Sequence, residues 1–442
     1  MTSPDDGDEG DPRERLIEAL LAGSGEVETS RWKRLGSSAL TLFKGRDLVG
    51  QALGWATSDG ERVDDVVARL GQLKGIAMKT GQLASYLDLD LPDEAQDAMA
   101  ALRTHAQPLS ADRVGSIVRE DLGPAADDVL AELEPEPIAA ASIGQVHRAR
   151  APDGTPVAVK VQYPGIADAI EKDFRAGAIG PKIVETIAPG AEVQSFHDEA
   201  REVFLAECDY EREARMQARF RRLFRDHPVI EIPDVYPELS SQRVLVTELV
   251  DAPGFETFLA SDPSQEHRDA IGRALFDFYL GSLFREGVFN ADPHPGNYLF
   301  PDHERLVVLD HGCVRRFDDA FVDNLARLSR AARHDDPDAL EAVLVEQGIV
   351  EPGSEDRDEI HELIRSFYGA WLVDETHPVD LDESVAFREL YERRFDLARL
   401  NMPAEFLFLI RIRFGLMAVL EDLGAEANWF QLEEDLVDER LS

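Results

Sequence analysis

The sequence predicts an α+β fold with two lobes, preceded by a helical extension. Apolar residues recur at helical spacing within residues 61–132, whereas residues from 138 to about 161 alternate as strands do, around an Asp153-Gly154 hairpin. Residues 318–442 predict helices only. We therefore expect four segments: an acidic disordered tail (1–25), a helical extension (26–132), an N-lobe of strands (133–250) and a largely helical C-lobe (251–442).

The composition narrows the class of protein. The 442 residues include 46 Lys and Arg and 87 Asp and Glu, a formal net charge of −41, which argues against nucleic-acid binding and is typical of adaptation to high salt. Two cysteines, Cys208 and Cys313, predict a reduced, cytoplasmic protein rather than a disulfide framework. The most apolar window, Phe406–Leu420, is too short for a transmembrane helix, and the acidic N-terminus does not resemble a signal peptide.

One segment departs from the acidic composition. Residues 31–46 hold five basic residues and no acidic one, together with Trp32 and Phe43. This pattern favours an interfacial helix in peripheral contact with an anionic membrane, at the inner face of the cell membrane. A helix docked on an acidic domain of the same chain is an equal alternative.

The N-lobe strands contain a candidate phosphate-binding lysine. Lys160 lies in the strand sequence VAVKV after the hairpin, where protein kinases place a lysine that contacts the α and β phosphates of ATP. An ordinary half-exposed strand is the alternative. The small residues expected at the phosphate loop are Ala139, Ala140, Ala141 and Ser142. Alanine allows the backbone less freedom than glycine does, so nucleotide binding here is expected to differ from that of a conventional kinase.

Two further elements complete the predicted nucleotide site. A charged helix is expected from about Asp198 to Phe224, and one of its carboxylates (Glu207, Asp209 or Glu213) should pair with Lys160. The buried strand Val244–Val250 fits a hinge between the lobes, where backbone groups of Glu248 and Val250 can pair with adenine. An amphipathic helix over residues 266–288 leads into the next motif.

The stretch Phe289–Val314 carries the candidate catalytic groups. Asp292 and Asn297 stand as Asp-x4-Asn, a spacing that lets the loop fold back on itself, and Asp310 follows a predicted strand. In protein kinases such a loop Asp positions the acceptor hydroxyl, while the Asn and a second Asp hold Mg2+. Oxygen ligands of this kind suit Mg2+ better than a soft metal.

Two other interpretations of this stretch are open. DPHPGN could be a Pro/Gly surface loop without a catalytic role. A metal site built on His294, His303 and His311 is weaker, because no HExxH-like helical pairing supports it.

In this order the motifs resemble the ABC1/ADCK/UbiB (AarF) family of atypical kinases, from about Leu70 to Arg315. The resembling stretches are Lys79–Gln82 (KTGQ), Ala139–His147 (AAASIGQVH), Lys160–Gly165 (KVQYPG), Glu207–Glu213 (ECDYERE), Asp292–Asn297 (DPHPGN) and Asp310–Gly312 (DHG). The resemblance implies a protein-kinase-like fold, binding of ATP and Mg2+, and a role in quinone or other isoprenoid-lipid metabolism at membranes.

The resemblance also implies roles for individual residues. Glu213 would orient Lys160 on the phosphates, Asp292 would be the catalytic-loop Asp, and Asn297 and Asp310 would hold Mg2+. Lys79 and Gln82 would lie over the acceptor side, with Lys79 paired to Glu207 or Asp209. We expect Lys79 to restrain the enzyme, and the alternative is that it is itself catalytic. One departure is His311, which replaces the phenylalanine of the family's usual DFG.

The predicted function is that of an ATP- and Mg2+-dependent atypical kinase or ATPase, with ATP or ADP and a quinone-like or isoprenoid lipid as partners. A nucleotide-gated scaffold with negligible turnover is the alternative from another class. The presence of Lys160, Asp292, Asn297 and Asp310 together favours the enzyme. A phosphotransferase like the aminoglycoside or choline kinases is a third possibility, against which the KTGQ and ECDYERE stretches argue.

Overall fold

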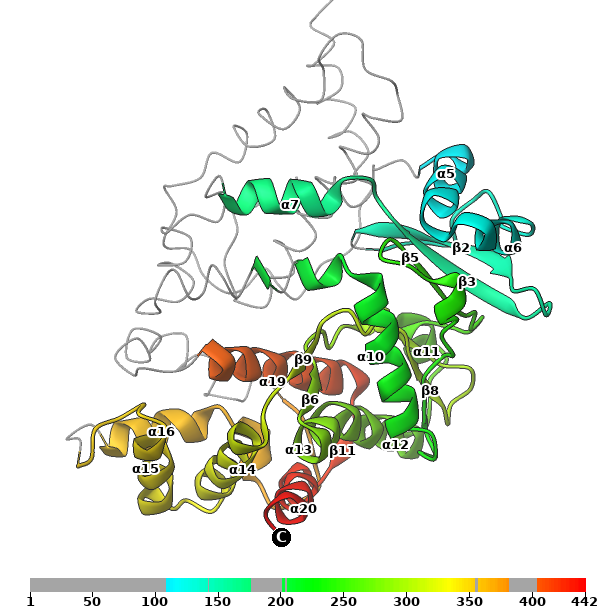
Figure 1. Ribbon diagram of the computed structural model, residues 1–442. Helices are drawn as coiled ribbons and strands as arrows, with labels where there is room; N and C mark the ends of the chain where they lie inside the picture. The colour runs from blue at the N-terminus through cyan, green and yellow to red at the C-terminus, as the bar shows by residue number, and fades with distance from the viewer. Residues whose placement is uncertain (1–108, 142, 176–200, 203–204, 354–356, 381–403) are drawn as a thin grey trace, which may run out of the picture.

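The computed structural model describes residues 109–141, 143–175, 201–202, 205–353, 357–380 and 404–442. It confirms the predicted α+β fold with two lobes (Figure 1). Lys79, Gln82, Ser142 and the basic segment 31–46 lie outside the described residues. Within the described ranges, no helix has both the length and the hydrophobicity needed to cross a bilayer.

The N-lobe is built on an antiparallel sheet with the strand order β1-β2-β3-β5. Its strands are β1 (Ala139–Ala140), β2 (Gly144–Arg150), β3 (Pro156–Gln162) and β5 (Val244–Glu248). In β3 the three valines are buried, while Ala158 and Lys160 point to the other face, as the alternation predicts. Gly154 has a φ of +86° in the β2–β3 turn, which confirms the hairpin. At Gly144 an added Cβ would lie 2.3 Å from the carbonyl oxygen of Val161, so the close approach of β2 and β3 requires glycine.

A helical pair covers the valine face of this sheet (Figure 1). It consists of α5 (Ala111–Leu122), the 3-10 turn η2 (Gly123–Ala125) and α6 (Ala126–Leu130). Two buried polar residues of β2 attach it: the amide of Leu109 donates to Gln145 Oε1 over 2.8 Å, and His147 Nδ1 lies 2.8 Å from the carbonyl oxygen of Glu134. The Gln145 and His147 side chains of the AAASIGQVH stretch therefore join β2 to the segments on either side of the helical pair.

The opposite face of the sheet packs against two other helices, α7 (Ile166–Arg175) and α10 (Tyr210–Leu223). The prediction of one helix from about Asp198 to Phe224 is wrong at Cys208 and Asp209, where the helical backbone is interrupted. Asp209 is the N-cap of α10, and its carboxylate accepts from the amide of Arg212 over 2.9 Å. Helical periodicity does not reveal this break, because an aspartate suits a helix cap as well as a solvated face.

Helix α10 also reaches the C-lobe, where Phe220 and the C-cap residue Phe224 enter the main hydrophobic core. The expected helix over 266–288 is divided into α12 (Gln265–Phe276), the π-helical turn η4 (Asp277–Gly281) and α13 (Ser282–Glu286). It ends at Gly287, whose φ of +60° is left-handed. The prediction was therefore wrong at its C-terminal end, because Val288 already begins strand β6 (Val288–Asn290).

Short strands hold the loops of the C-lobe. The parallel pair β4 (Ile230–Glu231) and β8 (Leu306–Val308) continues into β7 (Tyr298–Leu299), and β6 pairs with β9 (Val314–Arg316). Strand β8 confirms the strand expected before Asp310. The 3-10 turn η3 (Pro237–Leu239), helix α11 (Phe255–Ala260) and the 3-10 turn η5 (Pro295–Asn297) complete this region.

The remaining C-lobe is mostly helical. Its elements are α14 (Asp319–Arg333), α15 (Pro337–Glu346), α16 (Arg357–Ser366), η6 (Gly369–Leu372), β10 (His377–Pro378), α19 (Ala404–Leu423), β11 (Glu426–Ala427) and α20 (Trp429–Leu441). The expectation of helices only is wrong, because β10 and β11 pair with each other. The indole of Trp429 donates to the carbonyl oxygen of His377 over 3.1 Å beside this pair. Two-residue strands are too short to leave an alternating pattern in the sequence.

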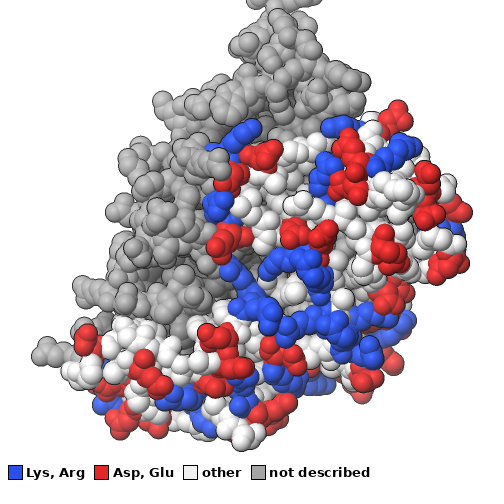
Figure 2. Space-filling view, viewed as in Figure 1, with Lys and Arg blue, Asp and Glu red and all other residues white. Residues whose placement is uncertain are grey.

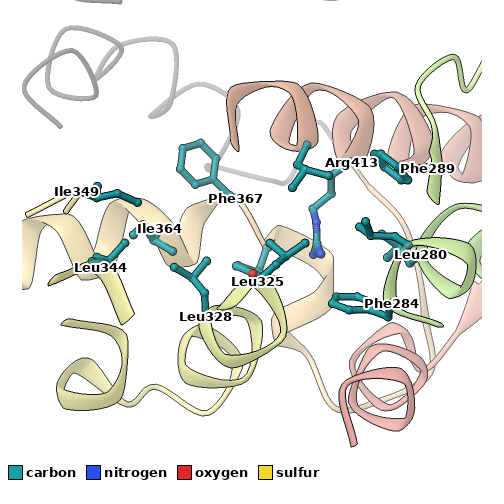
Figure 3. A pocket seen from close by; sticks show the side chains of 13 residues that line it. Leu280, Phe284, Phe289, Leu325, Leu328, Leu344, Ile349, Ile364, Phe367 and Arg413 are labelled. Carbon is teal, nitrogen blue, oxygen red and sulfur yellow. The ribbon is translucent and has the colours of Figure 1, made fainter. Parts of the chain in front are cut away.

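A buried ion pair lies within these helices. Arg413 of α19 and Glu433 of α20 are 2.7 Å apart, and Glu433 also accepts from the hydroxyl of Ser329 over 2.6 Å. Arg413 is the only charged residue among the described residues that line a small cavity of about 60 Å³ between α13, α14, α16 and α19 (Figure 3). The other lining side chains are apolar apart from Tyr368, whose ring lies 4.4 Å from the Arg413 guanidinium.

Candidate functional site

The centre of the site is an ion pair between the N-lobe sheet and helix α10. Lys160 Nζ lies 2.8 Å from Glu213 Oε1 and 3.0 Å from Oε2. Of the three carboxylates that the sequence offered as partners of Lys160, the structure selects Glu213. Burial raises the pKa of Glu213 to about 7. Burial alone would lower the pKa of Lys160, but Glu213 and Asp310 outweigh it and raise that pKa well above its ordinary value, so the ammonium stays charged.

Asp310 joins this pair from the other lobe. Its Oδ2 lies 3.8 Å from Lys160 Nζ, and its Oδ1 accepts from the amide of Gly312 over 2.8 Å. His311 between them is fully buried, with its ring centroid 5.1 Å from that of Phe220 and 6.1 Å from that of Phe278. Burial lowers the pKa of His311 to about 4, so the imidazole is neutral and packs here among aromatic rings, as a phenylalanine can.

The Asp-x4-Asn loop folds back on itself as its spacing predicts. The side-chain nitrogen Nδ2 of Asn297 donates to Asp292 Oδ2 over 3.1 Å and to the backbone carbonyl oxygen of Asp292 over 3.0 Å. This arrangement leaves the amide oxygen of Asn297 as the atom for a metal. The loop is supported from the π-helical turn, where the hydroxyl of Tyr279 donates to the carbonyl oxygen of Asp292 over 3.3 Å and lies 2.7 Å from the hydroxyl of Tyr298.

A residue without a predicted role connects this loop to Asp310. The amide nitrogen of Asn290 donates to the carbonyl oxygen of Asp310 over 2.8 Å, and its oxygen accepts from the amide of Asp292 over 3.1 Å. In addition, the amide of Leu309 donates to the carbonyl oxygen of Asn297 over 3.0 Å. These bonds hold Asp292, Asn297 and Asp310 as one group. Asn290 stands two residues before Asp292, and only the three-dimensional contact gives it this role.

The other expected nucleotide-binding residues that the structure describes lie on the same sheet or next to its strands. Ala139 and Ala140 form the exposed edge strand β1, and the amide of Ala141 donates to the carbonyl oxygen of Gly144 over 2.9 Å. Strand β5 ends at Glu248, so Val250 lies in the connection beyond it. The amide of Glu248 already donates to the carbonyl oxygen of Asp234 over 2.8 Å.

Three residues of the ECDYERE stretch contact the Asp310 loop or begin α10. Glu207 accepts from the thiol of Cys313 over 2.7 Å. Asp209 is used as the N-cap of α10 and lies 3.7 Å from Arg215. Arg212, which the sequence did not single out, donates to the carbonyl oxygens of Gly312, over 2.9 Å, and Val314. The expected partner of Glu207 or Asp209, Lys79, lies outside the described residues.

The donor set fits Mg2+ better than a transition metal. Among the described residues there is no group of three or more His, Cys, Asp and Glu side chains that could hold a metal ion. The histidine site considered from sequence gains no support: His311 is buried among aromatic rings, and His303 lies 3.0 Å from the Ser261 hydroxyl. Asn297 and Asp310 offer the few oxygen ligands that Mg2+ takes from a protein when phosphates supply others.

Comparison with known proteins agrees with the family resemblance of the sequence motifs. The family description "ABC1 atypical kinase-like domain" matches residues 101–344. The chain is 31% identical over 289 residues to the mitochondrial atypical kinase COQ8B of Danio rerio, covering 65% of this chain and 46% of that protein. It is 34% identical over 282 residues to the mitochondrial atypical kinase coq-8 of Caenorhabditis elegans, covering 61% of this chain and 36% of that protein. The chain thus spans less than half the length of these two relatives.

A solved structure is also similar. Rv3197 of Mycobacterium tuberculosis, determined in complex with erythromycin, superposes with a TM-score of 0.60 at 27% identity, covering 90% of this chain and 100% of that chain. The family match and this neighbour together confirm the kinase-like fold.

Proposed function

Because this chain belongs to the ABC1 atypical kinase-like family, we propose that it binds Mg2+ and ATP between its lobes and acts as an atypical kinase or ATPase. The observation that carries the proposal is the charged cluster of Lys160, Glu213 and Asp310, with separations of 2.8 and 3.8 Å from the lysine. The Lys160 side chain is largely buried, and a buried lysine needs carboxylate partners to stay charged. A cation so placed is suited to the phosphates of a nucleotide.

Each residue of the site then has a chemical role. Lys160, oriented by Glu213, contacts the phosphates, and the neighbouring residues Ala139–Ala141 cover them. Asn297 and Asp310 would hold Mg2+, whose positive charge would stabilise the negative charge that develops on the phosphate. Asp292 is only 8% exposed and is fixed by Asn297 and Asn290. In this position its carboxylate orients the attacking hydroxyl or water and accepts its proton.

Nucleotide binding is the first expected result. ATP or ADP with Mg2+ should raise the melting temperature, because binding to the folded state alone stabilises it by about 2.7 kcal/mol at a hundredfold excess over Kd. Asp310→Asn should remove most of the Mg2+-dependent part of this shift while the shift with nucleotide alone persists. The measurement is a thermal-shift titration in high salt. Absence of any shift in the wild type, under conditions where the protein is folded, would contradict the proposal.

The substrate class is the finer part of the proposal. We propose that the enzyme serves quinone or isoprenoid-lipid metabolism and makes peripheral contact with an anionic membrane through residues 31–46. Purified protein in high salt should hydrolyse or transfer the γ-phosphate of ATP faster when liposomes containing a quinone-like lipid are present. Liposomes without that lipid, and the lipid in detergent, separate the membrane effect from the lipid effect. Equal turnover in all arms would exclude a lipid partner, and nucleotide binding without turnover would favour the scaffold alternative.

A further inference from the structure

We propose that Arg212 is a positioning residue for Mg2+ binding, because it holds the backbone of residues 312–314 so that Asp310 is pre-organised for the metal. The inference rests on the proposed function, since Asp310 is a metal ligand only if Mg2+ and nucleotide bind here. Arg212 itself contacts backbone carbonyls of the loop and is not proposed to contact substrate or metal.

The guanidinium of Arg212 spans the loop directly after Asp310. Nη1 donates to the carbonyl oxygen of Gly312 over 2.9 Å, and Nη2 donates to that of Val314. One planar group thereby joins two carbonyls that stand two residues apart, which fixes the direction of the chain between them. The arginine is itself fixed at its base, because its amide donates to the Asp209 carboxylate over 2.9 Å at the N-cap of α10.

Neighbouring residues reinforce the same contact. Glu213, the next residue on α10, holds Lys160, which lies 3.8 Å from Asp310. Glu207, just before the N-cap, accepts from the Cys313 thiol over 2.7 Å. Room in the loop is small: a Cβ added at Gly312 would lie 3.3 Å from Asp310 Oδ1 and 3.5 Å from Glu213 Oε2. Contacts between the start of α10 and the Asp310 loop therefore lie both before and after Gly312 in the sequence.

The Arg212 guanidinium is partly buried and lies near other positive charges, unlike the side chain of an ordinary surface arginine. Burial, together with the positive charges of Arg315 and Arg215, lowers the pKa of Arg212 from its usual value. Arginines gather on this face of the molecule, over α10 and the elements beside it (Figure 2). The guanidinium of Arg212 points at two carbonyl oxygens, whose partial negative charges compensate for this burial and repulsion.

Residues that orient metal ligands without touching the metal typically change metal affinity by about 10- to 100-fold when they are replaced. We therefore expect Arg212→Gln to raise by about tenfold or more the Mg2+ concentration that gives half of the Mg2+-dependent thermal shift at fixed ATP. The shift with ATP alone should be unchanged. Arg212→Lys keeps the charge but cannot span both carbonyls. Its Mg2+ midpoint should therefore lie between those of the wild type and Arg212→Gln.

A second measurement reports the loop in the free protein. Because the Cys313 thiol is bonded to Glu207 when the loop is docked, Arg212→Gln should increase the rate at which iodoacetamide labels Cys313, measured by peptide mass spectrometry. Cys208 is an internal reference, because it is buried and burial raises its pKa to about 12. The control variant is Arg222→Gln, an exposed arginine of the same helix without a bond to the loop. It should leave both readouts at their wild-type values.

The outcomes separate this proposal from the proposed function. A wild type without any Mg2+-dependent shift means that the proposed function fails, and the role of Arg212 fails with it. If the wild type shows the shift and Arg212→Gln has the same Mg2+ midpoint, the positioning role alone is overturned. A changed midpoint with unchanged Cys313 labelling also overturns it, because the effect would then come from charge and not from the loop.

Discussion

Replacing Asp292 by asparagine should lower ATP turnover by about a hundredfold or more while leaving nucleotide binding intact. The proposed carboxylate accepts a proton in the reaction, and removing such a group typically costs a factor of 10² to 10⁴. Asparagine has the same shape, and its oxygen can still accept from the amide nitrogen of Asn297, now 3.1 Å from Asp292 Oδ2. Steady-state turnover and the thermal shift with Mg2+ and ATP, measured on the same preparation, check this.

A matched control is Glu304→Gln, which removes one exposed carboxylate of the same lobe. It should retain wild-type turnover. If Asp292→Asn keeps full turnover, Asp292 does not act on the acceptor. If it loses both turnover and binding, the main role of the Asp292 carboxylate is structural, through its bond to the Asn297 side chain.

The largest expected effect on stability comes from Glu433→Gln. The Glu433 side chain is fully buried and 2.7 Å from the Arg413 guanidinium, which is only 11% exposed. Removing one partner of a buried ion pair leaves an uncompensated charge and typically costs 3–5 kcal/mol. Burial alone would raise the pKa of Glu433, but Arg413 and Arg333 hold it below its usual value, so the wild-type pair is ionised at neutral pH. Denaturant unfolding followed by the fluorescence of the buried Trp371 and Trp429 measures the loss.

Two controls test the cause of that loss. Glu439→Gln removes an exposed carboxylate of the same helix, 2.9 Å from Arg285, and should change the free energy of unfolding by no more than about 1 kcal/mol. The double variant Arg413→Met with Glu433→Leu should recover most of the stability, since apolar residues can replace a buried pair with little cost. A loss of less than 1 kcal/mol in Glu433→Gln would show that Arg413 finds compensation in the rings of Tyr368 and Trp371.

The errors made from sequence have a common origin. The expected helix from Asp198 to Phe224 contains a cap at Asp209, and the expected all-helical C-terminus contains the β10–β11 pair. Both depend on the course of the chain outside the element, although the cap itself bonds locally, to the amide of Arg212. A cap is used only where the preceding segment turns away, and a two-residue strand exists only where another strand lies beside it.

By itself, the sequence determined the two-lobed fold, the order of its motifs and the tight turn of the Asp292–Asn297 loop. These follow from local causes: side-chain alternation along β3, the glycine of the hairpin, and a spacing that lets Asn297 reach Asp292. The helical pattern left Glu207, Asp209 and Glu213 open as partners of Lys160, the family resemblance implied Glu213, and the tertiary structure brings Glu213 to the lysine. Only the tertiary structure decided that Arg212 and Asn290 hold the Asp310 loop. The reason is helical phase: starting α10 at Tyr210 turns Glu213 toward the sheet and leaves Asp209 at the helix end, and the position of that start is fixed by packing between segments distant in the chain.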